Sequence, residues 1–264
     1  MEIGFIGAGK MGEAIIASLI NSRVLAAHEI CAYDVSRDRQ NFLKRKYGIN
    51  VYSKNKMVGA AQNIFFAVKP QDMDKALKEI APVITKSHLI ISIAAGKTIS
   101  SIEALLPGAK IIRVMPNIAV LVSEGMSVFC SGATVIAADK KTVVKLLSSF
   151  GKVVELPENK FDTVTALSGS GPAFFTYFLE KMVAAAVHEG MDRNNALLLA
   201  KQTMLGTSKL LIEKNVDPES LINDVTSGKG TTAAGLEVLK NSPVSDIIQR
   251  TINAAARRSK ELSA

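Results

Sequence analysis

The chain has 264 residues, of which 48% are hydrophobic and 21% charged, and its formal net charge at pH 7 is +8. This composition is typical of a globular protein with one large or two ordinary domains, and the longest apolar runs are too short for a membrane span. Basic residues are scattered, only 5% of residues are aromatic and Trp is absent. We therefore exclude nucleic acid as the main partner and expect a positive field that attracts small anions.

The cysteines and the first residues bear on the compartment. Cys31 and Cys130 lie in apolar runs without the spacing of metal ligands, which predicts buried thiols and no metal site. The segment MEIGFIGAGK has an acidic residue at position 2 and glycines within its apolar run, unlike a signal peptide. We expect a cytoplasmic protein.

From residue 1 to residue 157 the chain alternates short β-rich runs with helical patterns. The expected strands are residues 2–7, 29–34, 49–53, 63–70, 88–96, 110–117, 126–130 and 152–157. Helical patterns lie between several of them, at 12–22, 36–48, 73–84 and 100–108. Strands that alternate with helices of this length predict an α/β fold with a parallel, doubly wound Rossmann-type sheet over 1–157.

From residue 158 to residue 264 the pattern is helical throughout. The expected helices are residues 171–191, 193–215, 217–224, 231–241 and 244–262. Stretches such as MVAAAV and ALLLA are apolar on more than one helical face, which is more than a lone helical domain of this size buries. We expect an all-α C-terminal domain that forms an intertwined homodimer.

The first strand and the first helix are joined by a glycine motif. Gly7, Gly9 and Gly12 have the spacing G-x-G-x-x-G. In dinucleotide-binding folds these glycines permit the tight turn, the approach of the pyrophosphate and close helix–strand packing. The new helix directs its free amides and its dipole at the phosphates. Asp34, at the end of the second strand, is placed to hold the ribose 2′-OH.

The residues after Asp34 point to a different cofactor. A carboxylate repels a 2′-phosphate, so Asp34 favours NAD. Ser36, Arg37 and Arg39 follow at once, and together they are suited to bind a 2′-phosphate. The two signals conflict, and the residues alone leave the choice between NADH and NADPH open, with NADPH as our preferred expectation.

Two further strand ends are expected at the same edge of the sheet. One strand ends at Lys69–Pro70 and another at Ala94–Ala95. In an open parallel sheet, ligands bind beyond the carboxyl ends of the strands. The small residues there leave room for a nicotinamide.

A dehydrogenase that oxidises an alcohol needs a general base, usually His or Lys. His28, His88 and His188 lie in no motif. The β-hydroxyacid dehydrogenases carry a catalytic Lys on the first long helix after a glycine pair, and the matching position here is Phe175. We expect a reaction that needs little acid–base assistance.

The stretch DVTSGKGTTAAGL, residues 224–236, has the look of a phosphate-binding P-loop. That motif requires Ser or Thr after its Gly-Lys pair and a Gly five positions before it. Here Gly230 follows Lys229, and Asn223 occupies the earlier position. The stretch is therefore not a P-loop, and its glycines and hydroxyls need another explanation.

These motifs together resemble the pyrroline-5-carboxylate reductase family. The resemblance covers nearly the whole chain and includes GFIGAGKMGEA, FAVKPQ, ISIAAGKTI, RVMPN, TALSGSGPAF, QTMLG, DVTSGKGTTAAGLEVL and RRSKEL. It implies hydride transfer from NAD(P)H to the C=N bond of 1-pyrroline-5-carboxylate, giving L-proline. An imine can be protonated before hydride arrives, which explains the missing base. The alternatives are a reductase of another small anionic imino or keto acid, and a non-catalytic dinucleotide sensor.

The resemblance also implies roles for individual residues. The loop over 227–232 cradles the substrate carboxylate, with Thr232 as the hydrogen-bond partner of the ring nitrogen and the catalytic candidate. The implied substrate contacts are Glu158, Ser227, Gly230, Thr231 and Thr232. The expected cofactor contacts are Ile6, Gly7, Ala8, Gly9, Lys10, Met11, Gly12, Asp34, Ser36, Arg37, Asn55, Ala67, Val68, Lys69, Pro70, Ile93, Ala94, Ala95 and, across the dimer, Asp224. The helical domains of two subunits are expected to interlock, and higher assemblies of dimers are compatible.

The chain departs from the family pattern at two places. The usual S-P-G-G is Ser227-Gly228-Lys229-Gly230 here, which loosens the loop and adds a cation. The usual M-P-N-T-P is Met115-Pro116-Asn117-Ile118-Ala119, which removes a hydroxyl. Neither change removes a group that the chemistry requires.

Overall fold

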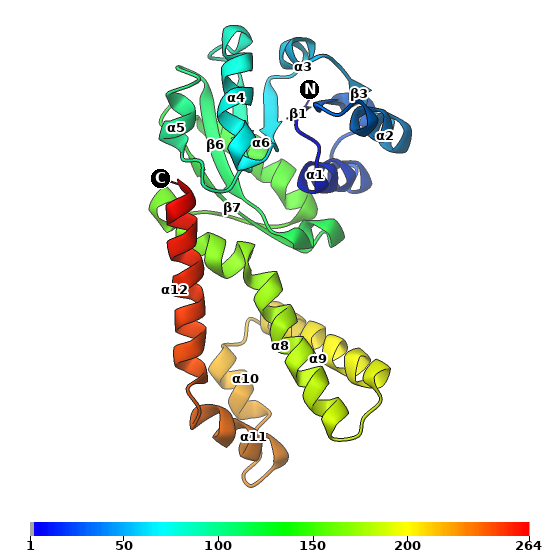
Figure 1. Cartoon of the computed structure of the whole chain (residues 1–264), viewed down its shortest axis with the longest axis vertical. Coiled ribbons are helices and arrows are strands. Elements are labelled where there is room, and N and C mark those ends of the chain that lie inside the picture. The colour runs from blue at the N-terminus through cyan, green and yellow to red at the C-terminus, as the bar shows by residue number, and fades with distance from the viewer. Residues whose placement is uncertain (1–2, 264) are drawn as a thin grey trace. The chain divides into compact units, whose positions relative to one another are not determined.

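The computed structural model describes residues 3–263, which form two compact units (Figure 1). Unit 1 contains residues 3–170 and 254–263, and unit 2 contains residues 171–253. The strands end near residue 157 as expected, but the compact units divide after Ser170. The end of the last helix also belongs to unit 1, which the division into 1–157 and 158–264 did not anticipate.

Unit 1 is built on one sheet of eight strands. The strand order is β3-β2-β1-β4-β5-β6-β7-β8, and the order in which strands are added reverses between β1 and β4, as in a doubly wound fold. The strands are β1 (Ile3–Ile6), β2 (Ile30–Tyr33), β3 (Asn50–Val51), β4 (Asn63–Phe66), β5 (Leu89–Ser92), β6 (Lys110–Met115), β7 (Gly125–Ser131) and β8 (Gly151–Glu155). All eight expected strands are confirmed.

One pair of strands departs from the expected parallel sheet. β6 and β7 are antiparallel, with Val114 opposite Phe129, whereas the other pairs among the described strands are parallel. The connection between β6 and β7 holds only the short 3₁₀ helix η3 (Ile118–Val122). A parallel crossover needs a dozen or more residues, so the short connection forces the strand to return in the opposite direction.

Helices cover both faces of the sheet. They are α1 (Lys10–Asn21), α2 (Arg37–Tyr47), α3 (Lys54–Ala60), α4 (Pro70–Ile80), α5 (Ile99–Glu103), α6 (Ala137–Leu147) and α7 (Phe161–Val164), with 3₁₀ turns η1 (Ala27–Glu29), η2 (Ala81–Val83), η4 (Ser148–Phe150) and η5 (Glu158–Lys160) and the π-helix η6 (Thr165–Gly169). One core joins α1, α2 and α6 to the sheet, and the other joins α3, α4 and α5. Because both faces are covered, β1 and β4 are buried at every position.

The alternation of side chains along the strands assigns each to one of these cores. Phe5 lies in the first core and Ile6 in the second, and on β4 the same holds for Phe65 and Phe66. Phe5 and Phe65 are paired in register and their rings stack with centroids 4.9 Å apart. This packing fixes the register of β1 against β4, and so the position of the glycine turn that follows β1.

The sequence patterns did not predict α3, α6 or α7. The helices α3 and α7 are too short to show a helical period, and α6 has two adjacent valines that obscure one. The helix α4 also begins at Pro70, three residues before the expected start, because proline is well tolerated in the first helical turn.

The second unit is helical. Its elements are α8 (Gly171–His188), α9 (Arg193–Lys214), α10 (Pro218–Asp224), α11 (Thr231–Lys240) and the first half of α12 (Val244–Ser263). Two residues cap these helices. Gly190 has φ +94° after α8, and the Asp217 carboxylate accepts hydrogen bonds from the amides of Glu219 and Ser220 at the start of α10.

Candidate active site

The turn between β1 and α1 has the geometry that dinucleotide binding requires. Gly7 has φ +83°, and a Cβ there would lie 2.8 Å from the carbonyl oxygen of Ala67. A Cβ at Gly12 would lie 2.9 Å from the carbonyl oxygen of Gly7, so helix and strand approach closely. At Gly9 a Cβ would meet no heavy atom of the described chain within 4 Å. Gly9 therefore opens onto free space, where a phosphate can approach the backbone.

Asp34 braces this turn. Its Oδ2 accepts a hydrogen bond from the backbone amide of Ala8 at 2.8 Å, and its Oδ1 accepts one from the amide of Ser36 at 2.9 Å. The amide of Gly7 donates to the carbonyl of Tyr33, the last residue of β2, at 2.9 Å. Asp34 thus ties the β1–α1 turn to the β2–α2 turn, a role that the sequence did not predict.

Arg39 also holds the β1–α1 turn in place. Its Nε donates to the carbonyl oxygen of Ala8 at 2.5 Å, and its Nη2 forms an ion pair with Glu13. Glu13 also accepts from Tyr47 at 2.8 Å and from Lys46 at 3.0 Å. Burial works against ionisation of Glu13, but the hydrogen bonds from Arg39, Tyr47 and Lys46 lower its pKa to about 2.

Because Arg39 is engaged with Ala8 and Glu13, fewer side chains are left to bind a 2′-phosphate. Arg39 was expected to share that role with Ser36 and Arg37. Ser36 caps α2, since its hydroxyl accepts from the amide of Arg39 at 3.3 Å, and both Ser36 and Arg37 are exposed. These two side chains remain available to an anion at the end of β2.

The loops after β4 and β5 lie at the same edge of the sheet as the glycine turn, because β2, β1, β4 and β5 are adjacent and parallel. Residues 67–69 join β4 to α4, which begins at Pro70, and residues 93–98 join β5 to α5. The amide of Ala67 donates to Ile6 at 2.8 Å and that of Ile93 donates to Phe66 at 3.1 Å, which aligns the loops. The fold thus brings together the loops that the sequence predicted to contact the cofactor. Asn55 is exposed on α3, the helix that follows β3.

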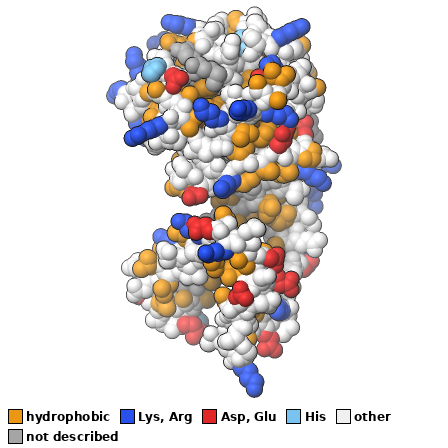
Figure 2. Space-filling model, turned by 180° about the vertical axis from the view of Figure 1, so that it is seen from behind, with side chains coloured by type: hydrophobic (Ala, Val, Ile, Leu, Met, Phe, Trp, Pro, Cys, Tyr) orange, Lys and Arg blue, Asp and Glu red, His pale blue; other side chains and the backbone are white. Residues whose placement is uncertain are grey.

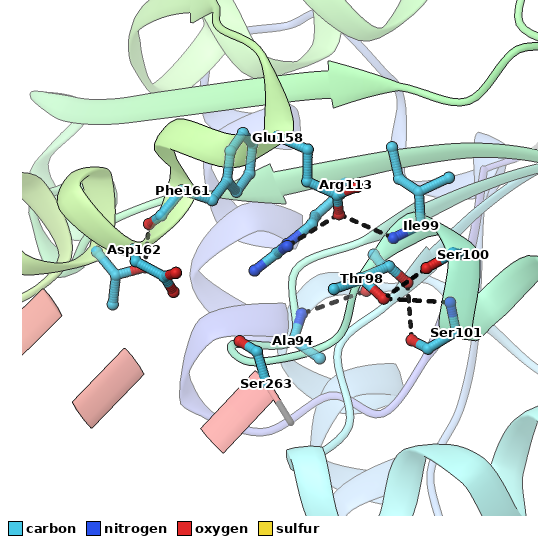
Figure 3. Close-up of polar contacts among 12 residues, drawn as sticks. Ala94, Thr98, Ile99, Ser100, Ser101, Arg113, Glu158, Phe161, Asp162 and Ser263 are labelled. Atoms are coloured by element: carbon cyan, nitrogen blue, oxygen red, sulfur yellow. Dashed lines mark hydrogen bonds and ion pairs between the residues drawn. The ribbon is translucent and has the colours of Figure 1, made fainter. Parts of the chain in front are cut away.

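Glu158 has partners of its own. Its Oε1 accepts from the amide of Ile99 and from Nη1 of Arg113, both at 2.9 Å, as Figure 3 shows. Arg113 is only 5% exposed, and its guanidinium carbon lies 4.7 Å from the centroid of the Phe161 ring. This geometry gives Glu158 a positioning role at the start of α5, and the substrate contact that the resemblance implied stays a prediction.

The loop from Ser227 to Thr232 lies in unit 2 and ends at the start of α11. Gly230 is the N-cap and supplies no side-chain hydrogen bond, so the first amides of α11 are left for another acceptor. A Cβ at Gly230 would lie 2.3 Å from the Ser227 hydroxyl oxygen, so a larger residue there would force the Ser227 side chain to move. Thr231 is exposed and Thr232 is half-buried. The arrangement suits a small anion held by backbone amides and the helix dipole. Asp224 is exposed at the end of α10.

His88 and the two cysteines lie outside these loops. Nδ1 of His88 accepts from the amide of Thr85 at 2.9 Å and its Nε2 lies 3.1 Å from the carbonyl oxygen of Val58, so His88 is structural. Cys31 and Cys130 are both buried thiols, as predicted. Burial, together with the nearby Glu158 carboxylate, raises the pKa of Cys130 to about 12. Within residues 3–263, no three His, Cys, Asp or Glu side chains are grouped to hold a metal, and no helix is long and apolar enough to cross a membrane.

Both halves of the chain match known families, and so does the whole. Residues 158–262 match the family described as pyrroline-5-carboxylate reductase dimerisation, and residues 2–96 match the family described as NADP oxidoreductase, coenzyme F420-dependent. A pyrroline-5-carboxylate reductase of Methanosarcina acetivorans is 41% identical over 263 residues, which are 99% of this chain and 97% of that protein. The chain belongs to the pyrroline-5-carboxylate reductase family.

Solved structures of this family have the same fold. A Coxiella burnetii pyrroline-5-carboxylate reductase superposes with a TM-score of 0.94 at 31% identity, covering 100% of this chain and 98% of that one. A Plasmodium falciparum pyrroline carboxylate reductase, solved with NADP bound, superposes with a TM-score of 0.89 at 30% identity and the same coverage. The resemblance and the fold class that the motifs predicted are thereby confirmed.

Proposed function

We propose that this chain reduces 1-pyrroline-5-carboxylate to L-proline with NADPH, the last step of proline biosynthesis. The observation that carries the proposal is a glycine turn shaped for a dinucleotide, in a chain that matches pyrroline-5-carboxylate reductases over 99% of its length. The anion-binding loop at the start of α11 supports it, because the substrate carries a carboxylate.

The cofactor loops have defined tasks in this proposal. The amides at the start of α1 hold the pyrophosphate, which approaches the backbone through the open space at Gly9. Ser36 and Arg37 bind the 2′-phosphate. The loops over 67–70 and 93–95 line the nicotinamide. When bound, NADPH supplies the hydride. The chain itself orients the donor and excludes water, which accounts for most of what a hydride transfer to an activated imine needs.

The substrate loop holds the imino acid by its carboxylate. The amides of the first turn of α11 donate to the carboxylate oxygens, and the helix dipole adds attraction. The Thr232 hydroxyl donates a hydrogen bond to the ring nitrogen of the neutral imine. Once the imine is protonated, the hydroxyl oxygen accepts from its N–H and stabilises this more electrophilic cation. Such a hydrogen bond to a charged species contributes about 1–3 kcal/mol.

Steady-state kinetics of a Thr232→Ala variant test the proposal. We expect kcat/KM for pyrroline-5-carboxylate to fall about 10-fold while the KM for NADPH is unchanged, since the lost contact is worth about 1.4 kcal/mol in the transition state. Thr226→Ala is the matched control, because the Thr226 hydroxyl donates within its own segment, to the carbonyl of Ile222 at 2.5 Å.

Two outcomes contradict different parts of the proposal. An unchanged kcat/KM in the Thr232 variant removes Thr232 from the mechanism and leaves the reductase intact. Absence of turnover by the wild type with NADPH and NADH, despite dinucleotide binding, overturns the reductase and favours a sensing protein. A higher kcat/KM for another small imino or keto acid than for pyrroline-5-carboxylate would make that acid the substrate.

The proposal includes a homodimer whose helical units interlock and complete each site. Large apolar side chains on α8 and α9 are exposed in the single chain, among them Phe175 (60%), Leu198 (66%) and Ile212 (68%). Orange hydrophobic side chains are visible on the surface of the helical unit in Figure 2. Soluble monomers rarely expose so much apolar surface, so we expect a second copy of the chain to bury it. If sedimentation at the assay concentration gave the mass of a single chain, the proposed dimer would be contradicted.

A further inference from the structure

The loop between β5 and α5 is contacted by the far end of the chain. Gly96 lies in this loop with φ +77° and is buried. A Cβ at Gly96 would lie 2.6 Å from the carbonyl oxygen of Leu262 and 3.1 Å from its carbonyl carbon. The backbone of the last turn of α12 therefore rests directly on Gly96, and both belong to unit 1.

The last turn of α12 is itself fixed. Ser259 is only 5% exposed, and its hydroxyl donates to Oδ1 of Asp162 on α7 at 2.7 Å. A hydrogen bond to an ionised carboxylate is among the stronger side-chain contacts in a protein. It sets the position of α12 along its axis, and hence where Leu262 meets Gly96.

The other end of the loop is anchored to the same region. The amide of Ile99, the first residue of α5, donates to Glu158 at 2.9 Å, and Arg113 holds Glu158 in place. Arg113 in turn lies against Phe161, the neighbour of Asp162. Figure 3 shows these residues together, with Ser263 at the end of α12 and Ala94 in the loop. Both anchors of the loop thus lead to residues 158–162.

We propose that the last turn of α12, Ser259–Ser263, is a clamp that positions the nicotinamide loop, residues 93–98. This inference rests on the proposed NADPH site, in which that loop lines the nicotinamide. Hydride transfer depends steeply on the placement of the donor, and a displacement of about 1 Å can cost about 100-fold in rate. Ser259 and Leu262 act through the loop, so they are positioning residues.

The clamp acts on one half of the cofactor. The adenosine half is assigned to the turns after β1 and β2, which are braced separately by Asp34 and Arg39. Loosening the clamp therefore weakens nicotinamide placement and leaves the adenosine half bound. A general loss of folding affects both halves equally, so the two cases can be separated.

Calorimetry with NADP⁺ and with adenosine 2′,5′-bisphosphate, which lacks the nicotinamide, tests the clamp. For Ser259→Ala we expect about 10-fold lower kcat, a weaker affinity for NADP⁺ and an increased isotope effect with 4-deuterated NADPH, because hydride transfer becomes slower. Affinity for adenosine 2′,5′-bisphosphate should stay within about 2-fold of the wild type. Thr251→Ala is the matched control, because Thr251 lies on the same helix outside the clamp and its hydroxyl donates to the Ile247 carbonyl at 2.8 Å.

A second pair of variants tests the contact itself. Gly96→Ala drives a Cβ into the Leu262 backbone, and deletion of residues 262–264 removes that obstacle. If the clamp exists, the two changes are non-additive, and the deletion lessens the loss of NADP⁺ affinity caused by Gly96→Ala. Strict additivity, equal losses for both ligands, or wild-type kcat in Ser259→Ala each overturn the clamp. Failure of the wild type to bind NADP⁺ at all would instead overturn the proposed function.

Discussion

Replacing Asp34 with Asn tests whether this carboxylate acts on the glycine turn or on the ribose. Asp34 accepts from the amides of Ala8 at 2.8 Å and Ser36 at 2.9 Å. Hydrogen bonds to a charged group contribute about 1.5–3 kcal/mol each, against about 1 kcal/mol for a neutral one. Asn keeps one acceptor in place and turns an NH₂ group toward the other amide. The bracing is therefore weakened by about 2 kcal/mol.

Part of this loss destabilises the fold and part reappears as the cost of ordering the turn when the cofactor binds. Assigning about 1.4 kcal/mol to binding gives an increase of about 10-fold in Kd. The increase should be the same for NADP⁺ and NAD⁺, because the turn contacts the pyrophosphate that both cofactors share. Calorimetry with both dinucleotides measures it. Asp38→Asn is the control, since Asp38 is exposed on the first turn of α2, the helix that follows Asp34, and the charge change is identical.

The opposite pattern would refute this reasoning. If Asp34 acts mainly on the ribose, the variant loses affinity for NAD⁺ and gains affinity for NADP⁺, whose 2′-phosphate is repelled by the carboxylate. A wild-type Kd for both cofactors would show that the two amides find other partners at no cost.

Two further predictions concern charged side chains. The pKa of Glu13 is lowered to about 2, so its contribution to stability is present above the unfolded value near 4.5 and is lost as the pH falls toward 2. Between pH 5 and pH 3 the free energy of unfolding of the wild type should therefore fall by about 1–2 kcal/mol more than that of Glu13→Gln, and parallel denaturation curves would contradict this. Lys229 has φ +61° in the substrate loop and is exposed. Lys229→Gly should raise the KM for the anionic substrate about 2- to 5-fold at low salt with kcat unchanged, and a KM equal to that of the wild type at low salt would show that the ammonium group points to solvent.

The sequence by itself determined the elements and their class. Short runs rich in Val, Ile and Phe predicted all eight strands, since a strand buried on both faces has a nearly continuous apolar sequence. The spacing of Gly7, Gly9 and Gly12 located the cofactor turn because its requirements are local: a positive φ, an open approach and close packing. The order of motifs along the chain identified the family.

Only the tertiary structure decided which partners the polar side chains have. Asp34 lies 26 residues from Ala8, Glu158 lies 59 residues from Ile99, and Ser259 lies 97 residues from Asp162. No local pattern records such pairs, because each partner is chosen by the packing of elements that are distant in sequence. The reversal at β7 was decided in the same way, by a connection too short to cross over. The sequence therefore located the loops of the site, whereas the tertiary structure determined which side chains hold those loops in place.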